Sequence, residues 1–373
     1  MMRNRPFDKI FTKAWFIPAF ILYCFSCGNT SQKPIAKAVI KDSIPFDSIP
    51  KVDTLSLIAV GDIMFGSNFP DASHLPPNDG KDLLTGFDSV LSNADVTFGN
   101  SEGVFLDAGG ESKGVGDNVY SFREPVKYAQ FFVDNGFDLI SVANNHVADF
   151  GKLGMKSTVS TLEKLNLNFA GLEDHPTTIF TIKNKKIGMA AFAPHTGCVQ
   201  MNDHAAAIAS VQKLKKECDI VVISFHGGAE GKNAQHVTRK TEMFLNQNRG
   251  NVYEFAHKMI DAGADVVIGH GPHVGRAMEL YNNKFIAYSL GNFCTYGQFN
   301  LKAPNCFAPL LKIWMNDKGD FIKGAITSVK QEGEGGPRPD AGFSSYKIIK
   351  ELTAADFPEG KLVFADSVNI FRK

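Results

Sequence analysis

The sequence of 373 residues has no excess of charge of either sign. Lys and Arg together number 39, as do Asp and Glu, so the formal net charge is zero. A general nucleic-acid binder needs a basic surface, and the charge balance therefore argues against a nucleic-acid partner. The apolar run at residues 14–25 is too short to span a bilayer comfortably. Hydrophobic residues make up 44% of the chain, which is typical of a globular protein.

Cysteine is scarce as well, with six residues in the whole chain. No Cys-x-x-Cys pair lies in the part predicted to fold, which argues against a zinc ribbon or a thioredoxin-type site. Four cysteines in that part are either buried thiols or partners in up to two disulfides, and the sequence leaves both readings open. These four are Cys198, Cys218, Cys294 and Cys306.

The first 27 residues have the composition of an export signal. A basic start precedes the apolar run, which ends in Ser26-Cys27 and so resembles a bacterial lipoprotein processing site. We expect cleavage before Cys27 and a lipid on that residue, which would anchor the protein to a membrane of the cell envelope. An ordinary signal anchor, or a secretory signal without lipid, is the alternative. Residues 28–52 are rich in Pro, Ser, Lys and Asp and predict a flexible tether.

From Leu55 onward, predicted strands alternate with predicted helices, and hairpins follow. Strands are expected at 55–60, 95–98, 138–142, 219–225, 265–268, 308–315 and 321–329. Helices are expected at 81–92, 125–135, 154–165, 205–217 and 252–262, and hairpins at 178–192 and 278–288. Residues 331–342 read as a loop, and the last thirty as a helix and a strand packed on the outside. This order predicts an α/β fold with a mixed or second sheet, whose ligands gather at the carboxyl ends of the strands.

Five of the predicted strands end in polar residues of the kinds that bind metals. They are Asp62, Asn100 with Glu102, Asn145 with His146, His226 with Glu230, and His270 with His273. If these ends converge on one edge, they form a site lined by carboxylates, amide oxygens and imidazoles. That mixture suits zinc, manganese or iron, and its carboxylates also suit magnesium or calcium.

The same motifs resemble those of a known family. The quoted segments are 61–64 (Gly-Asp-Ile-Met), 100–102 (Asn-Ser-Glu), 143–151, 226–230, 269–274 and 288–293. In this order they resemble the CapA-type capsule synthesis proteins named for poly-γ-glutamate, within the calcineurin-like metallophosphoesterase superfamily. The resemblance implies a four-layer α-β-β-α sandwich over residues 53–330. Residues 331–373 would then be a C-terminal extension packed on that domain.

The resemblance also implies roles for individual residues. His146 would be a general acid or a transition-state hydrogen-bond donor, oriented by Asp149. Glu230 would contact substrate. One or two divalent ions would be held by Asp62, Asn100, Glu102, Asn145, His226, His270 and His273. Apart from the resemblance, Arg123 and Arg276 are candidates to clamp a phosphate or a carboxylate of the substrate, with surface salt bridges as the alternative.

Two departures from the phosphoesterase pattern leave the activity open. Met64 stands where that pattern has a histidine, and Asn100 stands where it has a bridging aspartate. A thioether is a poor ligand for a hard cation, so the site is left with one metal, two or none. The first hypothesis is an exported, metal-dependent hydrolase acting on a γ-linked polyglutamate or a phosphoester. The second is a non-catalytic polymer-binding or assembly factor with a degenerate site.

Overall fold

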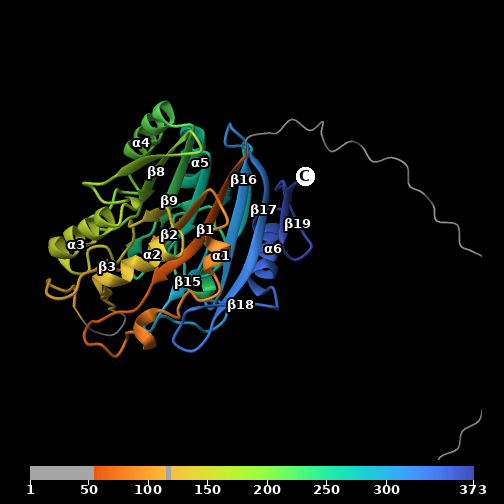
Figure 1. Cartoon of the computed structure of the whole chain (residues 1–373). Helices are drawn as coiled ribbons and strands as arrows, with labels where there is room; N and C mark the ends of the chain where they lie inside the picture. Colours follow the sequence, from red (N-terminus) through yellow and green to blue (C-terminus); the bar gives the residue numbers. More distant parts are fainter. Residues whose placement is uncertain (1–53, 115–118) are drawn as a thin grey trace, which may run out of the picture. The chain divides into compact units, whose positions relative to one another are not determined.

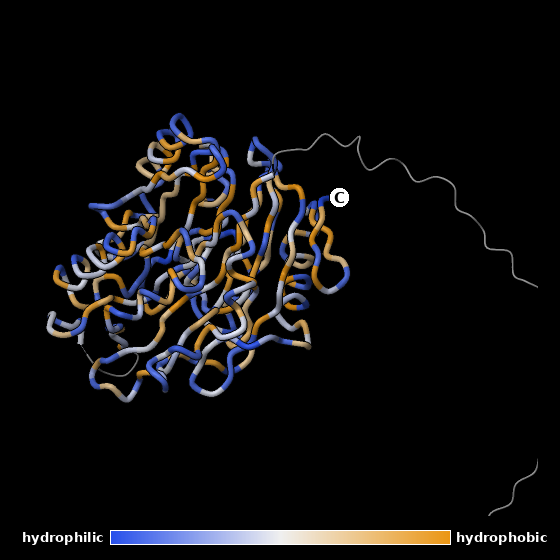
Figure 2. Tube along the Cα trace, viewed as in Figure 1, coloured by the Kyte–Doolittle hydropathy of each residue, from blue (hydrophilic) through white to orange (hydrophobic). Residues whose placement is uncertain are grey.

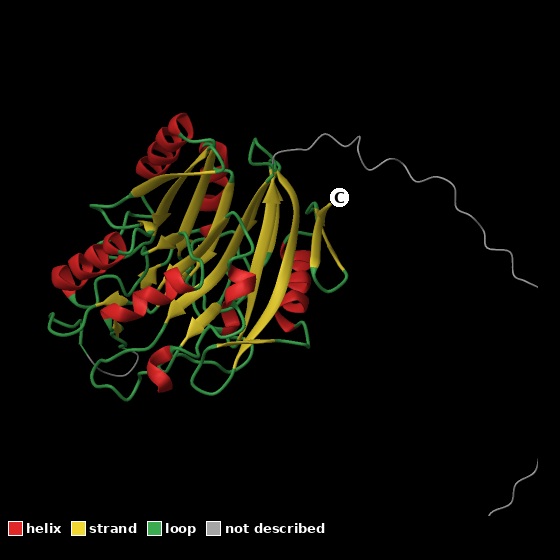
Figure 3. Cartoon of the chain, viewed as in Figure 1, coloured by secondary structure: helices red, strands yellow, loops and turns green. Residues whose placement is uncertain are grey.

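The computed structural model describes residues 54–114 and 119–373. The predictions for residues 1–27 and 28–52 lie outside this part. Two large sheets make up its centre, and helices lie on their outer sides (Figures 1 and 3). Among the described residues, no helix is both long and apolar enough to cross a membrane.

The first sheet has ten strands and mixes parallel with antiparallel pairing. Its path runs β19-β20-β17-β16-β1-β2-β5-β6, with β15 beside β1 and β18 beside β17. The parallel part consists of β1 (Leu55–Met64), β2 (Val96–Ser101), β5 (Leu139–Ser141), β6 (Asn168–Ala170) and β15 (Asn292–Thr295). The antiparallel part adds β16 (Phe307–Met315), β17 (Phe321–Gln331), β18 (Pro337–Pro339), β19 (Leu362–Ala365) and β20 (Asn369–Arg372).

The second sheet has six strands in the order β13-β14-β12-β9-β8-β7. Its parallel centre is formed by β8 (Lys185–Phe192), β9 (Ile220–His226), β12 (Val266–His270) and β14 (Lys284–Ala287). Antiparallel edges are β7 (Thr177–Ile182) and β13 (Met278–Tyr281). Two small ribbons pair β3 (Val104–Phe105) with β4 (Arg123–Glu124), and β10 (Met243–Phe244) with β11 (Gln247–Asn248).

The helices cover the outer faces and so complete a four-layer α-β-β-α arrangement, as the family resemblance implies. On the first sheet lie α1 (Asp88–Leu91), α2 (Gln130–Asp134) and α3 (Gly151–Lys164), and on the second α4 (His204–Glu217) and α5 (Val252–Ala262). The last helix, α6 (Ser344–Asp356), packs against β16, β17 and β13. Short 3-10 turns are η2 (Pro77–Gly80), η3 (Val126–Ala129) and η4 (Lys232–Ala234).

Apolar side chains from both sheets share one large core. It contains Ala59 of β1, Met189 of β8 and Ile268 of β12, and it continues to Phe132 of α2. A second core lies under α4 and α5, where Val211 and Phe255 pack against strands such as β9. Figure 2 shows the apolar stretches following the strands, with hydrophilic stretches in many of the connecting loops. The buried strands explain why their sequences read as nearly continuous apolar runs.

Several element boundaries differ from the sequence expectation. Strand β1 continues through Met64, so Asp62 lies inside the strand instead of after it. The helix expected over 81–92 is wrong apart from α1, because Gly86 adopts a positive φ of 87° that breaks the helix. Residues 331–342 contain β18, and the extension 331–373 pairs with β17 through β18 and β20. The hairpins and helices α3, α4 and α5 occur where they are expected.

The approach of β1 to the Leu290-Gly291 turn leaves no room for a side chain at Gly61. A Cβ built there would lie 2.0 Å from Gly291 O and 2.6 Å from Leu290 O. We expect Gly61→Ala to lower the free energy of unfolding by about 3 kcal/mol or more, since backbone must shift. Urea unfolding checks this. Gly275→Ala is the control, because its Cβ meets Ile349 at an ordinary 3.5 Å; equal losses in both variants would contradict the packing argument.

Candidate metal centre

The register of the strands sets the predicted ligands side by side. Asp62 of β1 pairs with Asn100 of β2 on one side and with Asn292 of β15 on the other. In the second sheet, His270 at the end of β12 pairs with His226 at the end of β9. The carboxyl ends of both sheets therefore supply the site, as the alternation of strands and helices predicts.

Asp62 contacts polar side chains that come from both sheets. Its Oδ1 accepts a hydrogen bond of 2.9 Å from Asn100 Nδ2 and lies 3.3 Å from His270 Nδ1. Its Oδ2 lies 3.1 Å from His273 Nδ1. The backbone N–H of Asp62 donates to Gly291 O at 2.8 Å, which fixes the residue against the turn before β15. Asp62, His226 and His270 are fully buried.

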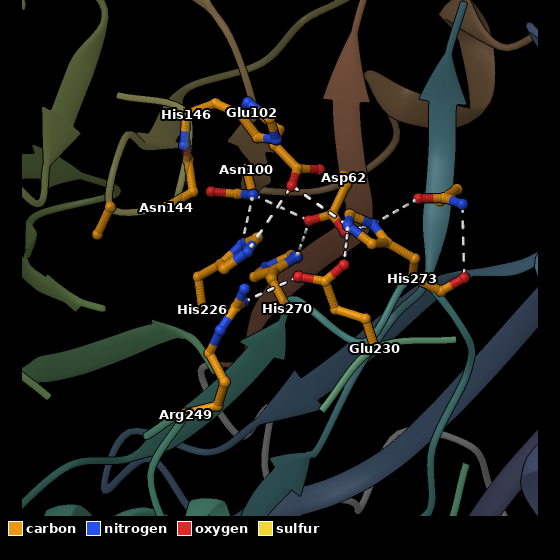
Figure 4. Close-up of polar contacts among 12 residues, drawn as sticks. Asp62, Asn100, Glu102, Asn144, His146, His226, Glu230, Arg249, His270 and His273 are labelled. Carbon is orange, nitrogen blue, oxygen red and sulfur yellow. Dashed lines mark hydrogen bonds and ion pairs between the residues drawn. The ribbon is translucent and has the colours of Figure 1, made fainter. Parts of the chain in front are cut away.

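Glu102 forms the second half of the centre. Its Oε1 lies 3.7 Å from His226 Nε2 and 3.5 Å from His273 Nε2. Ligand atoms of Asp62, Glu102 and His273 all lie within 4.8 Å of one another, close enough to share one ion. Figure 4 shows the imidazoles of His226, His270 and His273 gathered around the two carboxylates.

His273 adopts an unusual backbone conformation at the rim of this cluster. Its φ is +57°, a region that non-glycine residues rarely occupy. Asn292 holds the residue there, because its Oδ1 lies 2.9 Å from His273 Nδ1 and its Nδ2 donates to His273 O at 3.4 Å. Backbone strain of this kind is maintained at functional sites by the surrounding structure.

The centre contains many buried polar atoms that lack a hydrogen-bond partner within the described residues. Buried groups of this kind are costly, and native proteins rarely leave them unpaired. A divalent cation would satisfy them, because carboxylate oxygens, amide oxygens and imidazole nitrogens are its ligands. The residues present therefore fit a metal ion. The atoms are Asp62 Oδ2, Asn100 Oδ1, both oxygens of Glu102, Asn145 Oδ1, His226 Nε2, and both ring nitrogens of His270.

Mutual electrostatics set the protonation of the cluster. Burial and the charge of Asp62 raise the pKa of Glu102 well above its usual range. Burial alone would lower the pKa of His273, but Glu102 and Asp62 raise it to about 10. Burial alone would raise the pKa of Asp62, yet His270 and His273 hold it well below its usual range. Burial lowers the pKa of His226 well below its usual range. A metal that binds here must therefore displace a proton.

His146 and Asp149 lie together, as the sequence predicts for a proton-transfer pair. His146 Nδ1 lies 2.8 Å from Asp149 Oδ2, and Phe122 stacks on the imidazole with a centroid distance of 4.1 Å. Burial lowers the pKa of His146, which keeps the ring neutral near pH 7. Asn144 Oδ1 accepts the backbone N–H of His146 at 3.0 Å, and Figure 4 shows His146 on the same side of the centre as Glu102.

The residues predicted to bind substrate have different surroundings. Glu230 lies at the centre, with Oε2 4.0 Å from His273 Nε2. The fully buried guanidinium of Arg276 forms two hydrogen bonds of 2.9 and 2.8 Å with Glu242, so its salt bridge is buried and does not lie on the surface as the alternative expects. Arg123 donates to Asn68 Oδ1 at 2.6 Å and stacks over Phe69 and Phe150. Neither arginine points a free charge into the cluster.

Three neighbours of the centre carry no motif and were not predicted. Arg249 lies 2.9 Å from Glu230 Oε1, and Lys113 lies 2.5 Å from Asp149 Oδ1. His195 lies with its ring 6.2 Å from that of His226. Burial and Arg249 lower the pKa of His195 to about 3. Only the tertiary fold brings these residues to the site, since their sequence neighbours give no signal.

The described cysteines and Met64 stay outside the metal-binding cluster. Free thiols, and no disulfide, are found at the four described cysteines. Three are buried (Cys198, Cys218 and Cys294), and Cys306 is partly buried. Met64 is buried, and its sulfur accepts the backbone N–H of Gly66 at 3.1 Å. The thioether therefore has a local structural partner.

Another buried carboxyl, Glu124 of β4, lies apart from the cluster. Its Oε2 accepts the N–H of Phe65 at 2.7 Å, whereas Oε1 has no partner in the described part of the chain. Burial raises the pKa of Glu124 from 4.5 to about 8. Between these values the folded state binds more protons than the unfolded state, so stability falls as the pH rises, by up to about 1.4 kcal/mol per pH unit.

We expect Glu124→Gln to remove this pH dependence, because the amide stays neutral at every pH. Urea unfolding at pH 5 and pH 8 measures the effect. Glu351→Gln, at an exposed position of α6, serves as the control and should keep the wild-type slope. A Glu124→Gln variant with the wild-type slope would show that Glu124 is charged in the folded state at neutral pH.

Comparison with known proteins agrees with the motifs. A model of the family described as bacterial capsule synthesis protein PGA_cap matches residues 56–296. The PGA biosynthesis protein CapA of Bacillus subtilis (strain 168) is 30% identical over 335 residues, covering 84% of this chain and 82% of that protein. The capsule biosynthesis protein CapA of Bacillus anthracis is 25% identical over 324 residues, covering 81% of this chain and 73% of that protein.

Among solved structures, the calcineurin-like phosphoesterase YfkN from Bacillus subtilis aligns with a TM-score of 0.42 and 14% identity. The alignment covers 83% of this chain and 99% of that one. The family match covers the second sheet, the parallel strands of the first sheet from residue 56 onward, and every strand end that supplies the centre. The chain therefore belongs to the bacterial capsule synthesis (PGA_cap, CapA-type) family.

Proposed function

We propose that this protein is an exported capsule-synthesis factor whose strand-end centre is a metal-dependent hydrolase. The observation that supports this most is the set of unpaired, buried ligand atoms around Asp62 and Glu102, with the His146–Asp149 pair beside it. The proposed substrate is an anionic polymer such as γ-linked polyglutamate, or a phosphoester. The names of the two CapA relatives support a polymer of the capsule.

Asp62, Glu102 and His273 would hold the first ion, since their ligand atoms already lie within reach of one position. His226, His270, Asn100 and Asn145 would complete its shell or hold a second ion. A bound zinc, manganese or iron ion would polarise a carbonyl or phosphoryl oxygen of the substrate and lower the pKa of a water. Burial of the cluster excludes bulk water and strengthens each of these electrostatic interactions.

In this proposal His146 moves the proton. Asp149 Oδ2, 2.8 Å from Nδ1, fixes the tautomer that carries its proton on Nδ1, which leaves the lone pair of Nε2 free to accept a proton from the reacting group and to return it in a later step. Asp149 is itself held by the N–H of Phe122 at 2.7 Å. Stacking of Phe122 on the ring then limits the orientations that the imidazole can adopt.

A non-catalytic polymer-binding factor is the second candidate. Met64 favours it, because a buried thioether replaces an imidazole next to the centre. The purified full-length chain, loaded with zinc or manganese, should be assayed against aryl phosphoesters and γ-glutamyl peptides. Metal-dependent turnover of either class supports the hydrolase. Metal binding without turnover of either class contradicts it and favours the binding factor.

We also propose that the protein is anchored to a membrane of the cell envelope through a lipid on Cys27. The basic start, the apolar run and Ser26-Cys27 support this proposal. Labelled palmitate should be incorporated by the wild-type chain in a bacterial host and not by Cys27→Ser. Incorporation by both chains, or by neither, would contradict lipidation at Cys27.

A further inference from the structure

Arg249 is held firmly next to the centre by its backbone. It follows β11, and its N–H donates to Glu242 O at 2.9 Å while its carbonyl accepts the N–H of Gly228 at 2.8 Å. Glu242 is in turn fixed by the buried guanidinium of Arg276. These contacts tie the β10–β11 ribbon to the loop after His226, so the side chain of Arg249 is presented to the centre from a rigid support.

The guanidinium of Arg249 is buried and incompletely satisfied. The residue is 4% exposed, and its Nη1 lies 2.9 Å from Glu230 Oε1. That contact lacks hydrogen-bond geometry, and neither Nε nor Nη1 has a hydrogen-bond partner among the described residues. Burying a charged group without its full set of partners is costly, so the free donors indicate a missing acceptor.

Glu230 shows where an anionic group fits. Its carboxylate lies between Arg249 and His273, with Oε1 2.9 Å from Arg249 Nη1 and Oε2 4.0 Å from His273 Nε2 (Figure 4). The Glu230 carboxylate thus lies between Arg249 and His273 of the metal-binding cluster. Glu230 is partly exposed and its loop continues into Gly231, whose φ is 88°. A substrate anion that enters here meets a ready guanidinium and competes with the Glu230 carboxylate for it.

We propose that Arg249 is the anion-recognition residue of this site and binds a carboxylate or phosphate group of the substrate beside the metal-binding cluster. This inference rests on the proposed function, because it names the group that recognises the substrate of that centre. A planar guanidinium suits both kinds of anion, since its N–H groups match two oxygens at once. Glu230 then acts as the internal competitor that holds Arg249 in place before the substrate arrives.

Equilibrium binding of two probes tests the proposal. Inorganic phosphate is the probe for a phosphoester substrate. Glutarate, a dicarboxylate, is the probe for a polyglutamate substrate. Calorimetry on the full-length chain, with and without zinc, should show that Arg249→Met weakens binding of the preferred probe by about 10- to 100-fold. Arg249→Lys should retain part of the affinity. Arg249 pairs with Glu230 and lies over the ring of Phe244. Arg239→Met is the matched control, because Arg239 likewise pairs with a glutamate and lies over aromatic rings.

The Glu230→Gln variant tests the proposal independently, through a gain in probe affinity. Removal of the competing carboxylate should tighten probe binding several-fold, whereas a merely structural role of the Glu230–Arg249 pair predicts no gain. Metal content of every variant should match that of the wild type, and thermal unfolding of every variant should remain cooperative. The proposal is overturned if Arg249→Met binds both probes like the wild type, if the wild type binds neither at millimolar concentration, or if Arg249→Met loses the metal. Failure of the wild-type chain to take up metal, with probe binding still dependent on Arg249, would refute the hydrolase alone.

Discussion

Replacing Asp62 by asparagine should lower the affinity for zinc or manganese by about 100-fold or more and abolish hydrolysis. Substitutions in the outer shell of metal sites already cost about 10- to 100-fold in affinity. Asp62 touches Asn100, His270 and His273 at 2.9, 3.3 and 3.1 Å, so it joins the ligands of both sheets. The amide keeps the shape of the carboxylate but loses its charge. Metal titration by calorimetry and turnover of the best substrate measure the two effects.

The control for this change is Asp95→Asn, at the opposite end of the same pair of strands. Asp95 accepts hydrogen bonds from Ser56 N and Oγ at 2.8 and 2.9 Å, so its loss affects strand pairing and leaves the cluster intact. We expect this variant to bind metal like the wild type. Wild-type affinity in Asp62→Asn would mean that the β1 carboxylate is no ligand, and the account of the centre would fail.

His146→Asn should reduce kcat by about 10²- to 10⁴-fold while leaving the metal content unchanged. General acid–base catalysis by a positioned side chain contributes about this factor. The imidazole is clamped between Asp149, at 2.8 Å, and the ring of Phe122, at 4.1 Å, which is the geometry of a group that moves a proton. Asp149→Asn should cause a smaller loss, because it disturbs the tautomer and leaves Nε2 in place.

Steady-state kinetics with elemental analysis of the same samples separates this role from metal binding. His175→Asn serves as the control, because His175 also stacks on a phenylalanine, Phe169, and lies 3.8 Å from the carboxylate of Glu163. It should keep wild-type kcat. A His146→Asn variant that loses metal together with activity would assign His146 to the ligand shell and contradict its role in proton transfer.

The fold was largely predictable because the central parallel strands of its sheets are buried on both faces. Segments such as Ile220–His226 and Val266–His270 are continuous apolar runs, and α5 shows clear helical periodicity between them. The helix predicted over residues 81–92 is largely wrong, because the apolar spacing of this segment suits a helix but Gly86 adopts a positive φ. The short β6 and the β10–β11 ribbon were missed, since two or three residues give no measurable period.

The candidate site was predictable to the extent that its residues follow strands. Asp62, Asn100, His226 and His270 meet because strand register places them opposite one another. Arg249 and Lys113 reach the same site from a small ribbon and a glycine-rich loop, whose course depends on tertiary packing. Arg276 is the opposite case: it lies close to His273 in the sequence, but its guanidinium forms two hydrogen bonds with Glu242. The local sequence pattern therefore predicts which residues lie at the end of a strand. It does not predict which loops pack over that end in the folded protein.

Metal content of the full-length chain is the most direct test of the central claim. Elemental analysis after incubation with zinc and manganese should find at least one ion per chain in the wild type. The double variant His226→Ala with His270→Ala should hold clearly less metal than the wild type, since it removes two buried imidazoles from the cluster. A double variant that holds as much metal as the wild type, or a wild-type chain that stays empty at both metals, would contradict the account.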